Sequence, residues 1–263
     1  MSGPAGVIAL VLAETAAGAA GFLFLTPLWG EVKKGFFYLT GAIVVILAAG
    51  TAGAARAGYD PATGSGGRVA ESLAWGLAGA TILWMALVAL KARPAGHILG
   101  VLSVPLALAM LFEFARAANQ SVALSSFQLL AGAAFTGAVL DGLLLGHWYL
   151  TDRKLPRGPI NRMAWILIGS VAIDAIAIVA GGLGGGNQTQ AGNNSLNPLL
   201  SLAGSASLIA IGMVACTGLI AVFIRLALKG TRPQAVQSAT GFFYVAVITA
   251  FTAEVAAKIR FLP

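Results

Sequence analysis

Hydrophobic positions along this chain form eight long runs, separated by short polar segments. Each run holds about 20 or more mainly apolar residues, the length that a helix needs to cross a hydrocarbon layer of about 30 Å. The runs cover residues 4–29, 35–56, 69–91, 95–117, 123–150, 160–183, 198–228 and 234–257. Backbone groups inside lipid must bond within their own segment, and runs rich in Ala and Leu do so as helices. The pattern predicts an all-α fold, a polytopic transmembrane bundle of eight helices that forms a single domain over residues 1–263.

The composition agrees with this pattern. Hydrophobic residues make up 58% of the 263 residues and charged residues only 10%, with a mean hydropathy of +0.88. A globular chain carries about a quarter charged residues, so this chain must use lipid as its solvent. The first run has Glu14 at its centre and no basic segment before it, so we interpret it as a retained helix and not as a signal peptide. We expect a multi-pass protein of the cell inner membrane.

Basic residues predict the orientation. Eleven of the sixteen Lys and Arg residues lie around the loops that follow the first, third, fifth and seventh runs. They are Lys33, Lys34, Lys91, Arg93, Arg153, Lys154, Arg157, Arg162, Arg225, Lys229 and Arg232. By the positive-inside rule these loops face the cytoplasm, and both termini lie outside it. Because the basic residues alternate with apolar runs and form no continuous stripe, the net charge of +7 predicts no nucleic-acid partner.

Small residues suggest where helices approach one another closely. The chain has 34 glycines, several of them three to five positions apart within one run. The pairs are Gly18 and Gly21, Gly132 and Gly137, and Gly142 and Gly146. Such spacing permits close contact between membrane helices. We expect these positions to support ordinary tight packing.

Four ionisable residues inside the predicted helices have a partner on their own helix. A charged side chain at the centre of a membrane helix costs about 2.5 to 3.5 kcal/mol on insertion scales, so each one needs a reason. Glu254 and Lys258 are four residues apart, and Glu113 and Arg116 are three apart. At these spacings both pairs are predicted to be local ion pairs near the outer interface.

Three other acids, Glu14, Asp141 and Asp174, have no such partner and fall near the middle of the membrane by residue count. They are therefore predicted to face the interior of the bundle. One interpretation gives them a role in handling protons or in a path for a polar substrate. The other is structural, an interhelical hydrogen bond to Ser, Thr or Gln128.

The chain has two histidines, and both are predicted to lie just inside the cytoplasmic face. Runs 95–117 and 123–150 form a helical hairpin, in which His97 lies about 23 residues before the turn and His147 about 26 residues after it. At 1.5 Å per residue the two heights differ by only about 5 Å. The pair is thus a candidate for one shared cofactor site.

Three interpretations of this region stay open. His97 and His147 could hold a haem b between them. Alternatively His147 could bond a quinone carbonyl and exchange its proton with Asp141, with Trp148 and Tyr149 as ring contacts. In the third, Trp148 and Tyr149 are interfacial belt residues and His147 caps the helix end, where a cation interacts well with the dipole.

No motif of a soluble enzyme is present. The sequence lacks G-x-S-x-G, H-E-x-x-H, C-x-x-C and a P-loop, and it has no metal-binding motif. Its one cysteine, Cys216, allows no intrachain disulfide and no cysteine-ligated cluster. The chain is therefore expected to be at most a non-catalytic or quinone-binding subunit of an oxidoreductase.

The run FQLLAGAAFTGAVLDGLLLGHWYL at 127–150 resembles a helix of the membrane anchor subunits of molybdenum-type respiratory oxidoreductases, the NrfD/DmsC group. The resemblance rests on a glycine-spaced apolar helix that ends in Gly and aromatic residues, together with eight spans and external termini. It implies a quinone-reactive subunit that exchanges electrons with an iron-sulfur partner. The quinone-site residues of that group cannot be carried over, because run 35–56 has no ionisable residue in its apolar core.

These observations lead to one main functional hypothesis and two alternatives. The main hypothesis is a membrane subunit of a respiratory or electron-transfer complex that contacts quinone or haem, handles protons and binds other membrane, iron-sulfur or cytochrome subunits. The first alternative is a transporter or channel that uses the same buried acids for ion coupling. The second is a purely structural subunit of a larger membrane complex.

Overall fold

The computed structural model describes residues 2–61, 64–118, 120–152, 155–182, 202–230 and 234–259. Over these residues the secondary structure is helical, with no strand, and eight helices are long and apolar enough to span a membrane. They are α1 (Gly3–Leu25), α2 (Lys34–Ala57), α3 (Gly66–Ala89), α4 (Arg93–Arg116), α5 (Val122–Thr151), α6 (Gly158–Ala180), α7 (Leu202–Leu228) and α8 (Gln234–Lys258). This confirms the predicted all-α class and the eight spans, and indicates a multi-pass membrane protein.

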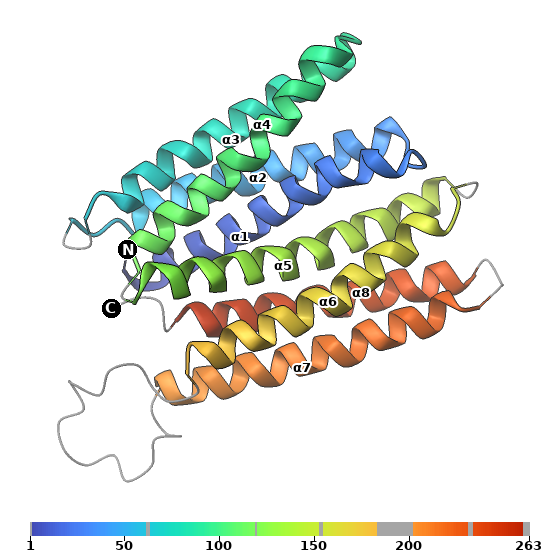
Figure 1. Cartoon of the computed structure of the whole chain (residues 1–263). Helices are drawn as coiled ribbons and strands as arrows, with labels where there is room; N and C mark the ends of the chain where they lie inside the picture. The colour runs from blue at the N-terminus through green and yellow to red at the C-terminus, as the bar shows by residue number, and fades with distance from the viewer. Residues whose placement is uncertain are drawn as a thin grey trace.

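The helices run alternately up and down, so both termini lie at the same end of the bundle (Figure 1). We call this the terminus end. The opposite end, here called the far end, carries the connections α1–α2, α3–α4, α5–α6 and α7–α8. The far end is the side that the basic residues predict to be cytoplasmic.

One helix boundary differs from the predicted runs by four residues, and the others that lie within the described residues differ by three or fewer. The first run was expected to be helical to residue 29, but α1 ends at Leu25 and a short 3-10 turn, η1 (Thr26–Trp29), follows. Pro27 disfavours a continued helix, and Gly30 ends the turn at a φ of 67°, which suits glycine. The seventh run was expected to begin at residue 198, whereas the structure describes α7 from Leu202. Residues 198–201 lie outside the described part of the chain.

The eight helices divide into two halves of four. In the first half α1 packs on α2, α2 on α3, α3 on α4 and α4 back on α1; α5 to α8 repeat the same order in the second half. One hydrophobic core lies mainly in the first half and also includes Leu129 and Ala133 of α5. The other lies mainly in the second half and also includes Phe36 of α2. The halves meet mainly along α1 and α5, with smaller contacts of α1 with α8 and of α4 with α5. A side chain on α1, α5 or α8 can therefore lie between the two halves.

The α1–α5 contact depends on two glycines. A Cβ atom on Gly18 would overlap the carbonyl oxygen of Ala133 and lie 2.9 Å from Cα of Gly137. A Cβ atom on Gly137 would in turn lie 2.6 Å from Cα of Gly18. The two backbones touch at this point, as expected for small residues between membrane helices. Gly21, the other member of the first predicted glycine pair, has nothing within 4 Å of such an atom.

At the far end, ion pairs also join the halves. Lys33 in the α1–α2 connection lies 2.5 Å from Asp152 at the end of α5, and Arg162 of α6 lies 3.0 Å from Glu31. The Arg162 guanidinium also lies 5.6 Å from the centre of the Trp29 ring. Because the side chains of Lys33 and Arg162 are 65% and 47% exposed, each pair contributes only about 0 to 1 kcal/mol.

Candidate functional site: a buried ion cluster between the halves

A buried group of charges lies between α1 and α8. Lys258, the last residue of α8, places its Nζ 2.7 Å from Glu14 Oε1 and 2.8 Å from Glu254 Oε2. The contact with Glu254 has hydrogen-bond geometry. The side chains of Glu14 and Glu254 are 0% exposed and that of Lys258 is 2% exposed. One ammonium group thus links the first half of the molecule to the second.

Asp174 of α6 adds a third carboxyl group. Its side chain is buried and lies close enough to Glu254 and Lys258 to interact with their charges. We call Glu14, Asp174, Glu254 and Lys258 the ion cluster. Two ionised carboxylates repel each other in a buried site, so a proton on one of them would relieve the repulsion. The ion cluster therefore contains three acids and one base in a buried site.

Glycine at position 132 makes room for the Glu14 side chain. A Cβ atom on Gly132 would lie 2.5 Å from Glu14 Oε1 and 2.7 Å from its Cδ. The carboxyl group therefore rests directly on the backbone of α5. The nearby contact of Gly18 with Gly137 brings α5 close enough for this packing. Two of the predicted glycine pairs thus contribute to the position of one acid.

The ion cluster has more acidic groups than its one ammonium group needs. Glu14 Oε2, Glu254 Oε1 and Asp174 Oδ2 are buried and accept no hydrogen bond from the described residues. A buried polar atom without a partner costs about 1 to 3 kcal/mol. No group of three His, Cys, Asp or Glu side chains in the described ranges has the arrangement of a metal site. The free carboxyl oxygens suit protons or water.

Asp141 is buried separately, further along α5. Neither of its carboxyl oxygens accepts a hydrogen bond from a described residue, and the side chain is 0% exposed. Asp141 lies nine residues beyond Gly132, which corresponds to about 13 Å along the helix toward the far end. Between them, the hydroxyl group of Thr136 donates to the carbonyl oxygen of Gly132. Buried acids therefore lie at two levels along α5.

The three residues at the end of α5 point in different directions. His147 is exposed on the outside of the bundle, and Trp148 is partly buried against Gly35 of α2. Tyr149 is buried in the core of the second half, where its hydroxyl group donates to the carbonyl oxygen of Pro156. Successive helical residues are rotated by about 100°, so these three side chains do not line one site.

His97 belongs to α4, but its side chain is outside the described part of the structure. The end of α4 that carries it lies apart from the far end of α5 in Figure 1, with α1 and α2 drawn between them. Together with the exposed position of His147, this placement gives no support to a haem held by both histidines. Haem binding stays a prediction.

The other sequence predictions for ionisable residues have clear outcomes. Glu14, Asp141 and Asp174 all face the interior, as predicted. The ion pairs Glu113–Arg116, at 3.0 Å, and Glu254–Lys258 are confirmed. The interpretation of Glu254 and Lys258 as a separate local pair was incomplete, because the same ammonium group also binds Glu14. The signal that could have suggested this link is Lys258, the basic member of an otherwise acidic set of buried charges.

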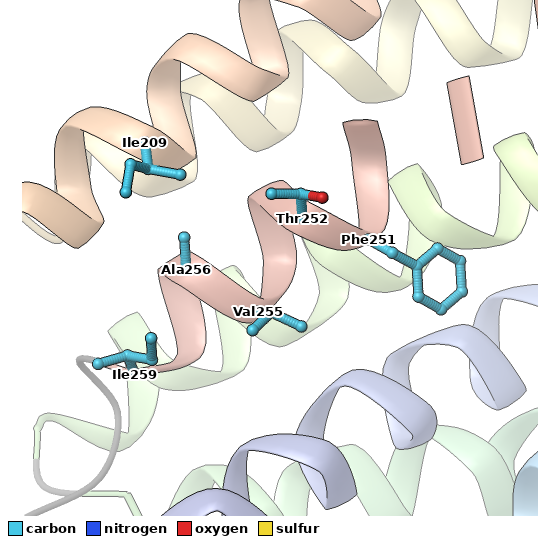
Figure 2. A pocket seen from close by; sticks show the side chains of 6 residues that line it. All are labelled: Ile209, Phe251, Thr252, Val255, Ala256 and Ile259. Atoms are coloured by element: carbon cyan, nitrogen blue, oxygen red, sulfur yellow. The ribbon is translucent and has the colours of Figure 1, made fainter. Parts of the chain in front are cut away.

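A groove lies between α7 and α8, and no residue of the ion cluster lines it. It has a volume of about 340 Å³ and is open to the surface. Figure 2 shows Ile209 of α7 facing Thr252 and Ala256 of α8. The complete lining is Ile209, Phe251, Thr252, Val255, Ala256 and Ile259. Because the lining has no ionisable group, the groove lacks the chemistry to bind a charged ligand.

Comparisons with protein-family models, with curated proteins and with solved structures found no match to this chain.

Proposed function

We propose that this chain is a proton-handling subunit of the cell inner membrane, in which the ion cluster takes up and releases protons. The observation that carries the proposal is a buried ammonium group that binds two carboxyl groups at the interface between the two halves, with the buried carboxyl group of Asp174 close enough to interact with them. A structural ion pair needs one carboxylate for one ammonium group. The two additional buried acids are costly unless they accept protons, and this favours proton handling over a purely structural role.

In this proposal Asp141 is a second site that binds a proton. It lies about 13 Å closer to the far end than the Gly132 level at which Glu14 rests, and it is equally buried. Chains of buried acids are typical of proton relays in membrane proteins. With the far end cytoplasmic and the termini outside, as the basic residues predict, protons pass between the ion cluster and Asp141 along α5. The resemblance to respiratory anchor subunits is consistent with such a role beside an electron-transfer partner.

Proton flux through the purified protein tests the proposal. Liposomes that contain the protein and a pH-sensitive dye are energised by a potassium diffusion potential. Wild-type protein is expected to conduct protons, and Glu14→Gln to reduce the rate by on the order of 10²-fold, the contribution of one positioned proton donor. Glu113→Gln, which removes an acid from an ion pair near the terminus end, is the matched control and should keep the wild-type rate.

A second variant in the same assay distinguishes the position of the acid from its presence. Gly132→Ala keeps every carboxyl group but forces Glu14 away from α5, so we expect a slower flux than in wild type. Gly169→Ala, where an added Cβ atom meets nothing within 4 Å, should have no effect. A wild-type flux equal to that of empty liposomes, or an unchanged rate in Glu14→Gln, would refute the proposal.

A quinone contact is the second candidate function, and Trp148 favours it. The indole Nε1 is buried and has no hydrogen-bond partner among the described residues. It lies near the far end, beside Gly35, where the absence of a side chain leaves space for the ring. An indole N–H group can donate to a quinone carbonyl oxygen. His147 and Tyr149 point elsewhere, so Trp148 is the residue of the predicted set that the geometry favours.

Quinone analysis of the purified protein checks this second candidate. Wild-type protein is expected to retain quinone after mild detergent extraction. Trp148→Phe removes the donor and keeps an aromatic ring, so the retained amount should fall by about fivefold to tenfold, as for the loss of one hydrogen bond. Trp165→Phe on the exposed face of α6 is the control. Extracts of wild-type protein without quinone would eliminate this function.

A further inference from the structure

Arg225 of α7 is held in a defined position near the far end. Its Nη1 donates to Asn161 Oδ1 at 2.6 Å, and its guanidinium group lies 4.6 Å from the centre of the Trp165 ring. Both partners belong to α6. Asn161 is itself fixed, because its Nδ2 donates to the carbonyl oxygen of Arg157 at 2.9 Å. The Arg225 side chain is thus oriented by an amide and an indole.

Arg225 has no carboxylate partner in the described residues, unlike Lys33 and Arg162 at the same end. A guanidinium group has five N–H donors, and only one of them is used in the bond to Asn161. Lys229 lies four residues later, in the turn directly after α7, and is exposed. Like charges at this spacing repel each other, so the pair favours an external anion.

The surroundings of Arg225 are those of a membrane interface. Trp165 is 59% exposed, and Phe223 and Leu226 of α7 are also exposed. These apolar side chains suit contact with acyl chains, whereas Lys229 marks the polar end of the helix. Indole rings concentrate at the level of the lipid headgroups. The unused donors of Arg225 therefore lie where the phosphate of a phospholipid would be found.

We propose that Arg225 and Lys229 bind the phosphodiester group of an anionic phospholipid, with Asn161 and Trp165 as positioning residues. A guanidinium group can bind two phosphate oxygens at once, and basic residues at the cytoplasmic side of membrane helices attract anionic headgroups. The exposed apolar surface of α7 accommodates the acyl chains of the same lipid. Free phosphate could use only the charges. This site is independent of the ion cluster and of proton handling.

Lipid binding to the purified protein, measured by native mass spectrometry, tests the site. We expect wild-type protein to bind phosphatidylglycerol more tightly than phosphatidylcholine, and an excess of inorganic phosphate to leave the lipid bound. Arg225→Gln should weaken phosphatidylglycerol binding by about tenfold, because it removes the charge and the bidentate contact. Arg68→Gln is the control. Arg68 also lies over an aromatic ring, 4.9 Å from the centre of Tyr59, but it belongs to the terminus end.

Two further variants keep the test valid if Arg225→Gln does not fold. Arg225→Lys retains the charge without the planar guanidinium group, and Lys229→Gln changes an exposed residue. Each should weaken binding, by less than Arg225→Gln. Wild-type affinity for phosphatidylglycerol in all three variants would overturn the proposal, as would equal binding of phosphatidylcholine. Displacement of the lipid by inorganic phosphate would contradict the assignment to a phospholipid.

Discussion

Replacing Lys258 by Met is expected to destabilise the folded protein by about 3 to 5 kcal/mol, the effect of removing one partner from a buried ion pair. The change removes the only basic side chain of the ion cluster and leaves Glu14 and Glu254 without their counter-ion. The measurement is thermal unfolding in detergent, followed by size-exclusion chromatography. Lys34→Met, at an exposed position at the start of α2, is the matched control and should unfold like wild type.

The destabilisation in Lys258→Met should depend on pH in a defined direction. Without the ammonium group, the buried acids avoid an unbalanced charge only when they carry protons. Protonation is favoured at low pH, so the difference from wild type should be smaller near about pH 5 than near about pH 8. Adding Glu14→Gln and Glu254→Gln should restore part of the stability at high pH. An equal loss of stability at both pH values would show that the ammonium group of Lys258 does not balance the charge of these acids.

Gly18→Ala is expected to have the second largest effect, a loss of about 3 kcal/mol from overpacking between α1 and α5. The new Cβ atom would overlap the Ala133 carbonyl oxygen and lie 2.9 Å from Cα of Gly137. Both neighbours are backbone atoms, so relief requires the helices to separate. Because α1 and α5 form the main contact between the halves, the whole interface is affected. The thermal unfolding assay measures this loss.

Gly21→Ala on the same helix is the control for this prediction. Nothing lies within 4 Å of a Cβ atom there, and the change should alter the free energy of unfolding by at most about 0.5 kcal/mol. Gly18→Ala should also slow proton flux, since separation of α1 from α5 moves Glu14 away from Gly132. If Gly18→Ala and Gly21→Ala change the free energy of unfolding by the same amount, the close contact of α1 with α5 does not exist in the membrane.

Much of the fold could be predicted from the sequence. The eight apolar runs gave the helices to within a few residues, because a membrane fixes the length of a spanning segment. The burial of Glu14, Asp141 and Asp174 could be predicted for a similar reason. A charged group is costly against lipid, so an acid without a local partner must turn inward. Spacing alone also predicted the contact of Glu254 with Lys258, because residues four apart lie on one helix face.

The partners of these groups were decided by the tertiary structure alone. Glu14 and Lys258 are separated by almost the whole chain, and no sequence pattern links α1 with α8. Lipid is as apolar as the helix surfaces, so hydrophobic periodicity reveals little about which helices become neighbours. The same is true of the end of α5. The sequence placed His97 and His147 at one height, but the rotation of each helix in the bundle determines where side chains point, and His147 faces outward. By itself the sequence therefore determined which segments span the membrane and that Glu14, Asp141 and Asp174 are buried. Only the packing of α1, α5, α6 and α8 decided that Glu14 and Asp174 join the pair of Glu254 and Lys258 in one cluster.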